Sequence, residues 1–141
     1  MKRLPPIFVD SDIVVSSLIS KTGATYLLIN KTSVERWISN LSQKEIKIVA
    51  ERLNLDKKKS KNIFTRFKTI KLKEVTKKLK EKYISYVVDL NDAHILAGAI
   101  EAKTGFLVSY NLKHFKIDKI KADFKIIVLT PAKFLQYLRS L

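Results

Sequence analysis

Cysteine is absent from this chain of 141 residues, and glycine and proline occur only three times each. The lack of cysteine excludes disulfides, zinc–thiolate sites and cysteine nucleophiles. So little glycine and proline argues against a collagen-like, linker-rich or disordered chain. No apolar run approaches the ~20 residues that a membrane-spanning helix needs, so we expect no membrane association and a cytoplasmic location.

Acidic residues are also scarce relative to basic ones. The sequence has 28 Lys and Arg against 13 Asp and Glu, which gives a formal net charge of +15 at pH 7. Hydrophobic residues make up 46% of the chain, which is enough for one globular core, and no linker or internal repeat divides the sequence. We therefore expect a single domain over residues 1–141 and a polyanionic partner.

The positive charge is concentrated between Lys57 and Lys82. This segment holds eleven lysines and Arg66 against only Glu74 and Glu81. A lysine-rich surface is also typical of proteins from hot-adapted organisms, where the lysines form ion-pair networks with acids. This segment has almost no acids, so such networks do not explain the clustering. The clustering therefore favours contacts with phosphate backbones, and the candidates for these contacts are Lys57, Lys58, Lys59 and Lys61.

Hydrophobic periodicity predicts alternating strands and helices. Three apolar runs predict buried strands over residues 7–9, 106–110 and 126–129, and residues 36–38 are expected to form a further strand. Helical spacing and capping residues predict helices over residues 13–19, 24–30, 42–53, 56–67, 75–88, 92–103 and 131–138. This alternation indicates an α/β fold with a parallel sheet in layers.

Several polar residues lie where strands end or helices begin. Asp10 and Asp12 directly follow the first predicted strand, and Asn111 follows the third. Glu45 and Asp92 lie in the first turns of helices that would pack beside those strands. Sites in parallel sheets form beyond the carboxyl ends of the strands. A group of carboxylates there would suit a hard cation such as Mg²⁺ or Mn²⁺.

These acids also have purely structural interpretations. Ser42 and Glu45 have the spacing of a capping box, and Asp12 is suited to the N-cap of the first helix. Asp92 lies in a helix first turn, where the macrodipole favours an acid. Asp10 is the hardest to explain in this way, because it has no capping role if Asp12 caps the helix. The histidines at positions 94 and 114 are expected to be hydrogen-bonded structural residues rather than ligands.

Four short motifs occur in one order along the chain. The first is an apolar strand, Asp10, a small residue and a second polar residue before an apolar helix, within residues 8–14. The second is Ser39 with Glu45 six residues on, with Glu51 as the fallback. The third is an acid before the Ala-rich segment 89–97 and an apolar strand, and the fourth is Thr-Pro followed by Phe-Leu within residues 130–135. Together the motifs resemble the PIN-domain nucleases, which include the VapC-type toxins of prokaryotic toxin–antitoxin pairs.

The resemblance implies a parallel sheet of about four or five strands with helices on both faces, a three-layer sandwich. It also implies a divalent-metal-dependent endoribonuclease that hydrolyses RNA phosphodiester bonds, with Mg²⁺ or Mn²⁺ as cofactor. The implied catalytic and metal-binding residues are Asp10, Glu45 and Asp92. The chain departs from the family at Asn111, where many members have a fourth Asp. The auxiliary candidates are Asp12, Asp89 and Asn111.

Two functions remain open from the sequence. The first is the endoribonuclease, acting as the toxin of a toxin–antitoxin pair, with an antitoxin protein as partner and a homodimer as its assembly. The second is an RNA-binding PIN-like domain with weak or no catalytic activity, which Asn111 favours and the three retained acids disfavour. In either case RNA is the expected partner, and we expect the basic segment 57–82 to form a rim beside the acidic site.

Overall fold

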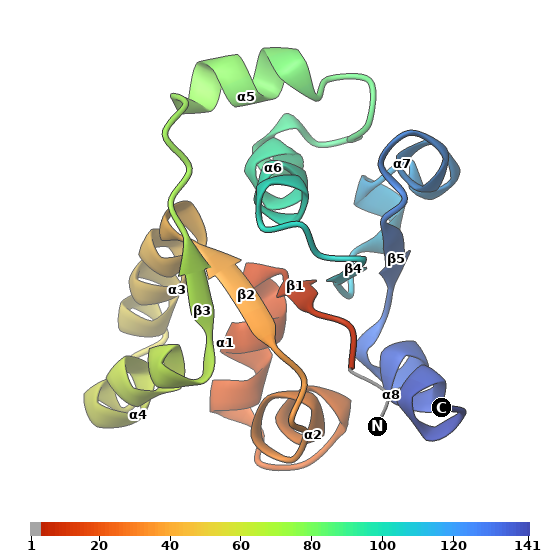
Figure 1. The fold of residues 1–141 in the computed structure, drawn as a ribbon. Helices are drawn as coiled ribbons and strands as arrows, with labels where there is room; N and C mark the ends of the chain where they lie inside the picture. Colours follow the sequence, from red (N-terminus) through yellow and green to blue (C-terminus); the bar gives the residue numbers. More distant parts are fainter. Residues whose placement is uncertain (1–3) are drawn as a thin grey trace.

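The computed structural model describes residues 4–141, and its centre is a five-stranded sheet (Figure 1). The strands are β1 (Ile7–Val9), β2 (Arg36–Ser39), β3 (Lys68–Ile70), β4 (Phe106–Val108) and β5 (Ile127–Leu129). They lie in the order β3-β2-β1-β4-β5, and every neighbouring pair is parallel. The predicted parallel α/β fold is thus confirmed.

Helices cover both faces of this sheet. One face carries α1 (Ser11–Ile19), α2 (Ala24–Asn30), α3 (Asn40–Arg52) and α8 (Pro131–Arg139), and the other carries α5 (Thr76–Lys82), α6 (Ala93–Glu101) and α7 (Ile117–Phe124). The short helix α4 (Lys57–Asn62) and a 3-10 turn (Ile63–Arg66) lead into β3. In residues 4–141 no single helix is long and apolar enough to span a membrane, and α1 and α2 pass that test only as a pair bent by 99°.

The strands supply the core of both layers because successive side chains point to opposite faces. Ile7 and Val9 pack against α1, α2 and α3, whereas Phe8 packs against α6. Gly98 allows this second contact, since a Cβ at that position would lie 2.3 Å from the Phe8 ring. The close approach holds α6, and the residues at its start, against the centre of the sheet.

The structure differs from the predicted elements on the basic segment and after β4. The predicted helix 56–67 is a short α4 followed by the 3-10 turn, and the predicted helix 75–88 ends at Lys82. Beyond Lys82 the chain forms a loop that pairs Val87 with Phe115 in an isolated bridge. β3 and α7 were not predicted.

Candidate active site

A cleft of about 480 Å³ lies at the carboxyl edge of the sheet. Its lining includes four acids, which come from the β1–α1 junction, α1, α3 and the start of α6. Asn111, which follows β4, also lines it. No lysine or arginine is among the lining residues in the described part of the chain. The cleft therefore brings together five of the six predicted catalytic, metal-binding and auxiliary residues, namely Asp10, Asp12, Glu45, Asp92 and Asn111.

Asp10 is the most buried of these acids, with 6% of its surface exposed. Its backbone N–H donates to the carbonyl of Val108, 3.0 Å away, which ties the residue to β4. Its Oδ2 accepts a hydrogen bond of 2.8 Å from the Ser109 hydroxyl. Burial, and then the charges of Asp12 and Asp92, raise the pKa of Asp10 to about 7.

Asp12 lies in the first turn of α1, and Asp10 occupies the N-cap position, so the predicted capping role of Asp12 is wrong. The side-chain amide of Asn111 donates to Asp12 Oδ2 over 2.9 Å. The other oxygen, Oδ1, is buried and has no hydrogen-bond partner in residues 4–141. Burial is the main cause that raises the pKa of this carboxyl. An unpartnered carboxylate oxygen of this kind is suited to a cation.

Asp92 is paired with His114 on the side of the cleft nearest Asp89. Nδ1 of His114 lies 2.9 Å from Asp92 Oδ2, while Asp89 accepts a hydrogen bond of 3.0 Å from the backbone N–H of Asn91. Within the described residues, Asp89, Asp92 and His114 form the only group of three candidate metal ligands whose atoms all lie within 4.8 Å of one another. Burial raises the pKa of Asp92 even though His114 opposes the rise. Sequence reasoning treated His114 as structural and missed this proximity.

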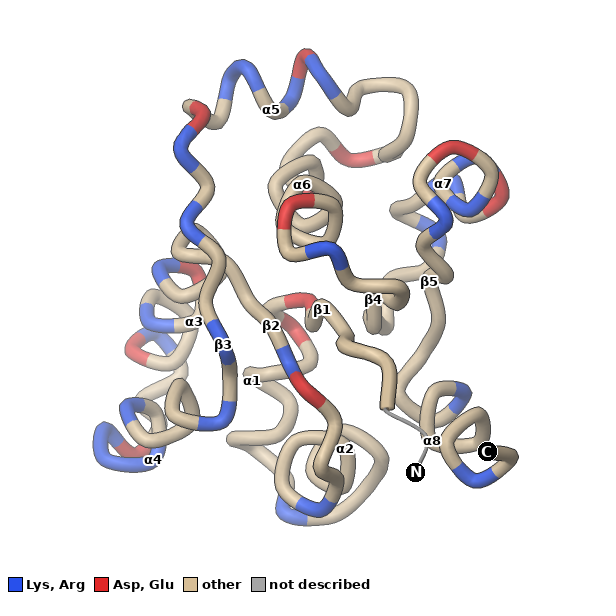
Figure 2. Tube along the Cα trace, viewed as in Figure 1, with Lys and Arg blue, Asp and Glu red and all other residues tan. Residues whose placement is uncertain are grey.

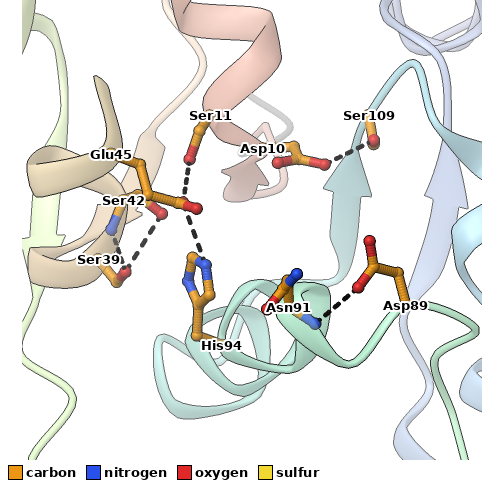
Figure 3. Close-up of polar contacts among 9 residues, drawn as sticks. All are labelled: Asp10, Ser11, Ser39, Ser42, Glu45, Asp89, Asn91, His94 and Ser109. Carbon is orange, nitrogen blue, oxygen red and sulfur yellow. Dashed lines mark hydrogen bonds and ion pairs between the residues drawn. The ribbon is translucent and has the colours of Figure 1, made fainter. Parts of the chain in front are cut away.

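Glu45 does not belong to a capping box, because Ser39 caps α3 by accepting the backbone N–H of Ser42 over 3.0 Å. The Glu45 side chain turns to the cleft instead (Figure 3). Its Oε1 accepts a hydrogen bond of 2.9 Å from the Ser11 hydroxyl and lies 3.1 Å from Nε2 of His94. Burial raises the pKa of Glu45, but the hydrogen bond and charge of His94 and the hydrogen bond of Ser11 hold it below its ordinary value.

The three predicted catalytic acids share this cleft without converging on one point. Within the described residues, Asp10, Glu45 and Asp92 do not together form a group whose ligand atoms all lie within 4.8 Å of one another. Each carboxylate is held by a donor from a different part of the chain. Mg²⁺ commonly keeps several waters and takes only one or two carboxylates directly. The oxygen-rich lining and its spacing therefore fit a hydrated divalent cation.

Helix α4 lies at the amino ends of the strands, whereas the cleft lies at their carboxyl ends. It carries Lys57, Lys58, Lys59 and Lys61. It connects the end of α3 to the start of β3, whereas Glu45 lies near the start of α3 (Figure 1). The seven helical steps from Glu45 to Arg52 alone span about 10 Å. The rim was expected from the whole segment 57–82, and its α4 part lies away from the acids. Figure 2 shows the basic residues running along α3, α4, β3 and α5.

Comparison with known proteins gives one family and several structures. A family model described as PIN domain matches residues 6–113. No curated protein matches the sequence significantly. A toxin–antitoxin complex from Klebsiella pneumoniae is similar with a TM-score of 0.64 and 20% identity, over 89% of this chain and 97% of that chain.

Two further solved structures are similar over almost the same region. VapBC2 from Rickettsia felis, bound to a DNA fragment from its promoter, gives a TM-score of 0.60 and 15% identity over 88% of this chain and 97% of that chain. FitAB bound to the IR36 DNA fragment gives a TM-score of 0.59 and 16% identity over 89% of this chain and 94% of that chain. At these identities the likeness concerns the fold.

Proposed function

Because the chain belongs to the PIN domain family, we propose that it is a divalent-metal-dependent endoribonuclease that hydrolyses RNA phosphodiester bonds. The observation that carries this proposal is the cleft at the carboxyl edge, where four acids meet and no lysine or arginine of the described chain lines the wall. Carboxylates gathered without lysine or arginine beside them repel one another. A bound divalent cation relieves that repulsion and gives the cluster a chemical use.

The proposed catalytic and metal-holding residues are Asp10, Glu45 and Asp92. The proposed auxiliary residues are Asp12, Asp89 and Asn111. All of these side chains offer oxygen donors, which suit Mg²⁺ or Mn²⁺, and the unpartnered buried Oδ1 of Asp12 supports a cation at this place. Such an ion, when bound, lowers the pKa of a coordinated water and stabilises charge that develops on the phosphate.

The chain's own donors would keep these acids in place during the reaction. The Ser109 hydroxyl fixes Asp10, and Nδ1 of His114 fixes Asp92. The Asn111 amide fixes one oxygen of Asp12 and leaves the other without a hydrogen bond in residues 4–141. Preorganised ligands of this kind reduce the reorganisation that substrate binding would otherwise require.

RNA would be retained by cations outside the cleft, because acids that bind a metal repel phosphate when the metal is absent. We assign this role to the basic segment, which follows the β3 edge of the sheet. Its lysines on α4, Lys57, Lys58, Lys59 and Lys61, would hold the strand away from the cleft. The lysines that follow the carboxyl end of β3, Lys71, Lys73, Lys77 and Lys78, would hold it closer to the acids.

The proposed biological role is that of the toxin in a toxin–antitoxin pair. The similar structures named above are toxin–antitoxin assemblies, two of them bound to DNA. We infer by this likeness an antitoxin protein as partner, a homodimer as assembly and the cytoplasm as the place of action. An adjacent small gene whose product co-purifies with this chain would support the pairing.

The test is cleavage of structured and unstructured RNAs by the wild type and the Asp10→Asn variant, with Mg²⁺, with Mn²⁺ and with EDTA. We expect metal-dependent cleavage that Asp10→Asn lowers by about 100-fold or more. The matched control is Asp118→Asn, which changes an exposed acid on α7 and should behave as the wild type. Wild-type rates in Asp10→Asn would refute the assignment. RNA binding by a wild type that does not cleave would favour the inactive RNA-binding domain instead.

A further inference from the structure

We propose that His94 is a positioning residue for Glu45. His94 donates a hydrogen bond to Oε1 of Glu45 and so leaves Oε2 for a divalent cation in the cleft. His94 lies on α6 and Glu45 on α3, so the contact joins helices on opposite faces of the sheet at its carboxyl edge. The inference rests on the proposed metal-dependent function, since it assigns a supporting role within that site.

Two donors converge on the same carboxylate oxygen. Nε2 of His94 lies 3.1 Å from Glu45 Oε1, and the Ser11 hydroxyl donates to this atom over 2.9 Å (Figure 3). A carboxylate oxygen has two lone pairs, so these donors occupy both of them. No hydrogen bond to Oε2 occurs within residues 4–141. The two oxygens of Glu45 are therefore unequal, and Oε2 is the one available to a cation.

The hydrogen-bonding capacity of His94 is directed at Glu45 alone. A carboxylate only accepts, so Nε2 of the ring carries the hydrogen. The other nitrogen, Nδ1, is buried and has no hydrogen-bond partner in the described chain. A buried histidine whose one hydrogen bond ends on a cleft acid has a directed role.

His94 is buried, whereas Glu45 is about half exposed. The His94 side chain is 9% exposed, whereas the Glu45 side chain is 47% exposed and has several rotatable bonds. The helix that carries His94 is itself held against β1 by the close approach of Gly98 to Phe8. His94 thus ties the exposed Glu45 side chain to α6. Groups that orient metal-binding carboxylates in this way typically change metal affinity 10–100-fold when they are removed.

Mn²⁺ binding to the full chain, measured by calorimetry without RNA, tests this role independently of cleavage. His94→Leu removes the donor, and His94→Gln keeps an amide N–H that can reach Glu45. We expect His94→Leu to weaken Mn²⁺ binding by about 10–100-fold and His94→Gln to stay within about 3-fold of the wild type. The matched control is Thr104→Val, which removes another buried hydrogen bond, to Ala99, outside the cleft, and should leave Mn²⁺ affinity unchanged.

Cleavage gives a second readout. The kcat of His94→Leu should recover at saturating Mn²⁺, because the proposed loss lies in metal affinity. If His94→Leu does not fold, His94→Asn replaces it, since this shorter amide does not reach Glu45 and should bind Mn²⁺ as weakly as expected for Leu.

Equal Mn²⁺ affinity in the wild type and the variant without a donor would overturn the inference while the proposed function stands. Equal losses in His94→Gln and the variant without a donor would do the same, because they would show a packing role. A wild type that binds no Mn²⁺ would overturn both the inference and the proposed metal dependence.

Discussion

Asp10 is the acid whose ionisation should cost the folded protein most. Burial, followed by the charge of Asp12, raises its pKa to about 7, whereas an aspartate in an unfolded chain titrates near 3.9. The folded state therefore keeps a proton that the unfolded state has already lost between these values. Stability from this group is fully present below about pH 4, is lost as the pH rises to about 7, and does not return above it.

Replacing Asp10 by Asn removes this loss, because the amide does not ionise. The rise in pKa from 3.8 to about 7 corresponds to up to about 4 kcal/mol of unfolding free energy, at 1.36 kcal/mol for each pH unit. The amide keeps a carbonyl oxygen to accept the Ser109 hydroxyl, which lies 2.8 Å from Oδ2 in the wild type. Asp10→Asn should therefore be more stable than the wild type by up to about 4 kcal/mol at pH 8 and nearly equal to it at pH 4.

Urea unfolding at pH 4, 6 and 8 in EDTA measures this difference. Urea is uncharged and leaves the repulsion between the acids unscreened. Asp118→Asn is again the control, and its difference from the wild type should stay small and flat, because that acid is exposed. Excess Mn²⁺ should stabilise the wild type more than Asp10→Asn and so reduce the difference between their free energies of unfolding. If Asp10→Asn gains no stability between pH 4 and pH 8, the argument that the cluster is costly fails.

Two further expectations concern the remaining candidates. Asp92→Asn should leave the melting temperature unchanged or higher, because burial raises the pKa of Asp92, and should abolish metal-dependent cleavage; a large loss of stability would instead indicate a capping role. Alanine at four lysines together should lower the salt slope of single-stranded RNA binding by about 0.7 for each phosphate that the variant no longer binds. One such variant replaces Lys57, Lys58, Lys59 and Lys61, and the other replaces Lys71, Lys73, Lys77 and Lys78. RNA titrations at several salt concentrations compare the two, and an unchanged salt slope would show that the lysines of that variant are solvated surface residues.

β1 and β4 could be predicted because each is a continuous apolar run that is buried on both faces. β3 could not, since Lys68 and Thr69 are exposed and the strand pairs on one side only, with β2. The α7 helix carried a signal that was available, with Ile117, Ile120 and Phe124 at helical spacing. Its basic and acidic residues between these positions belong to the solvent face of an amphipathic helix.

The basic segment shows why charge alone does not locate a binding surface. Its lysines are continuous in sequence, yet β3 runs through the middle of the segment. A strand carries the chain from one edge of the sheet to the other, so the lysines of α4 and those of α5 lie at opposite edges. Without β3 in the prediction, the segment was expected to lie wholly beside the acids.

The acids at the cleft followed from strand ends, but their partners did not. Asp10 had to reach the carboxyl edge because it directly follows β1. Whether Glu45 capped its own helix depended on Ser39, which takes the cap three residues earlier than the sequence suggested. Its actual partner Ser11 is 34 residues away along the chain, so only the packing of α1 beside α3 brings the two together.

The same partners explain how one cleft tolerates four acids. Asp10, Asp92 and Glu45 are each bound to a donor on a separate element, so a hydrogen bond offsets part of the cost of each carboxylate. Within the described residues, the three acids do not bring their ligand atoms within 4.8 Å of one another. Coulomb repulsion falls with distance, so this separation lowers it. On the proposed function, a cation bound between these acids would keep part of its water shell, and a water of that shell would be the nucleophile for phosphodiester hydrolysis.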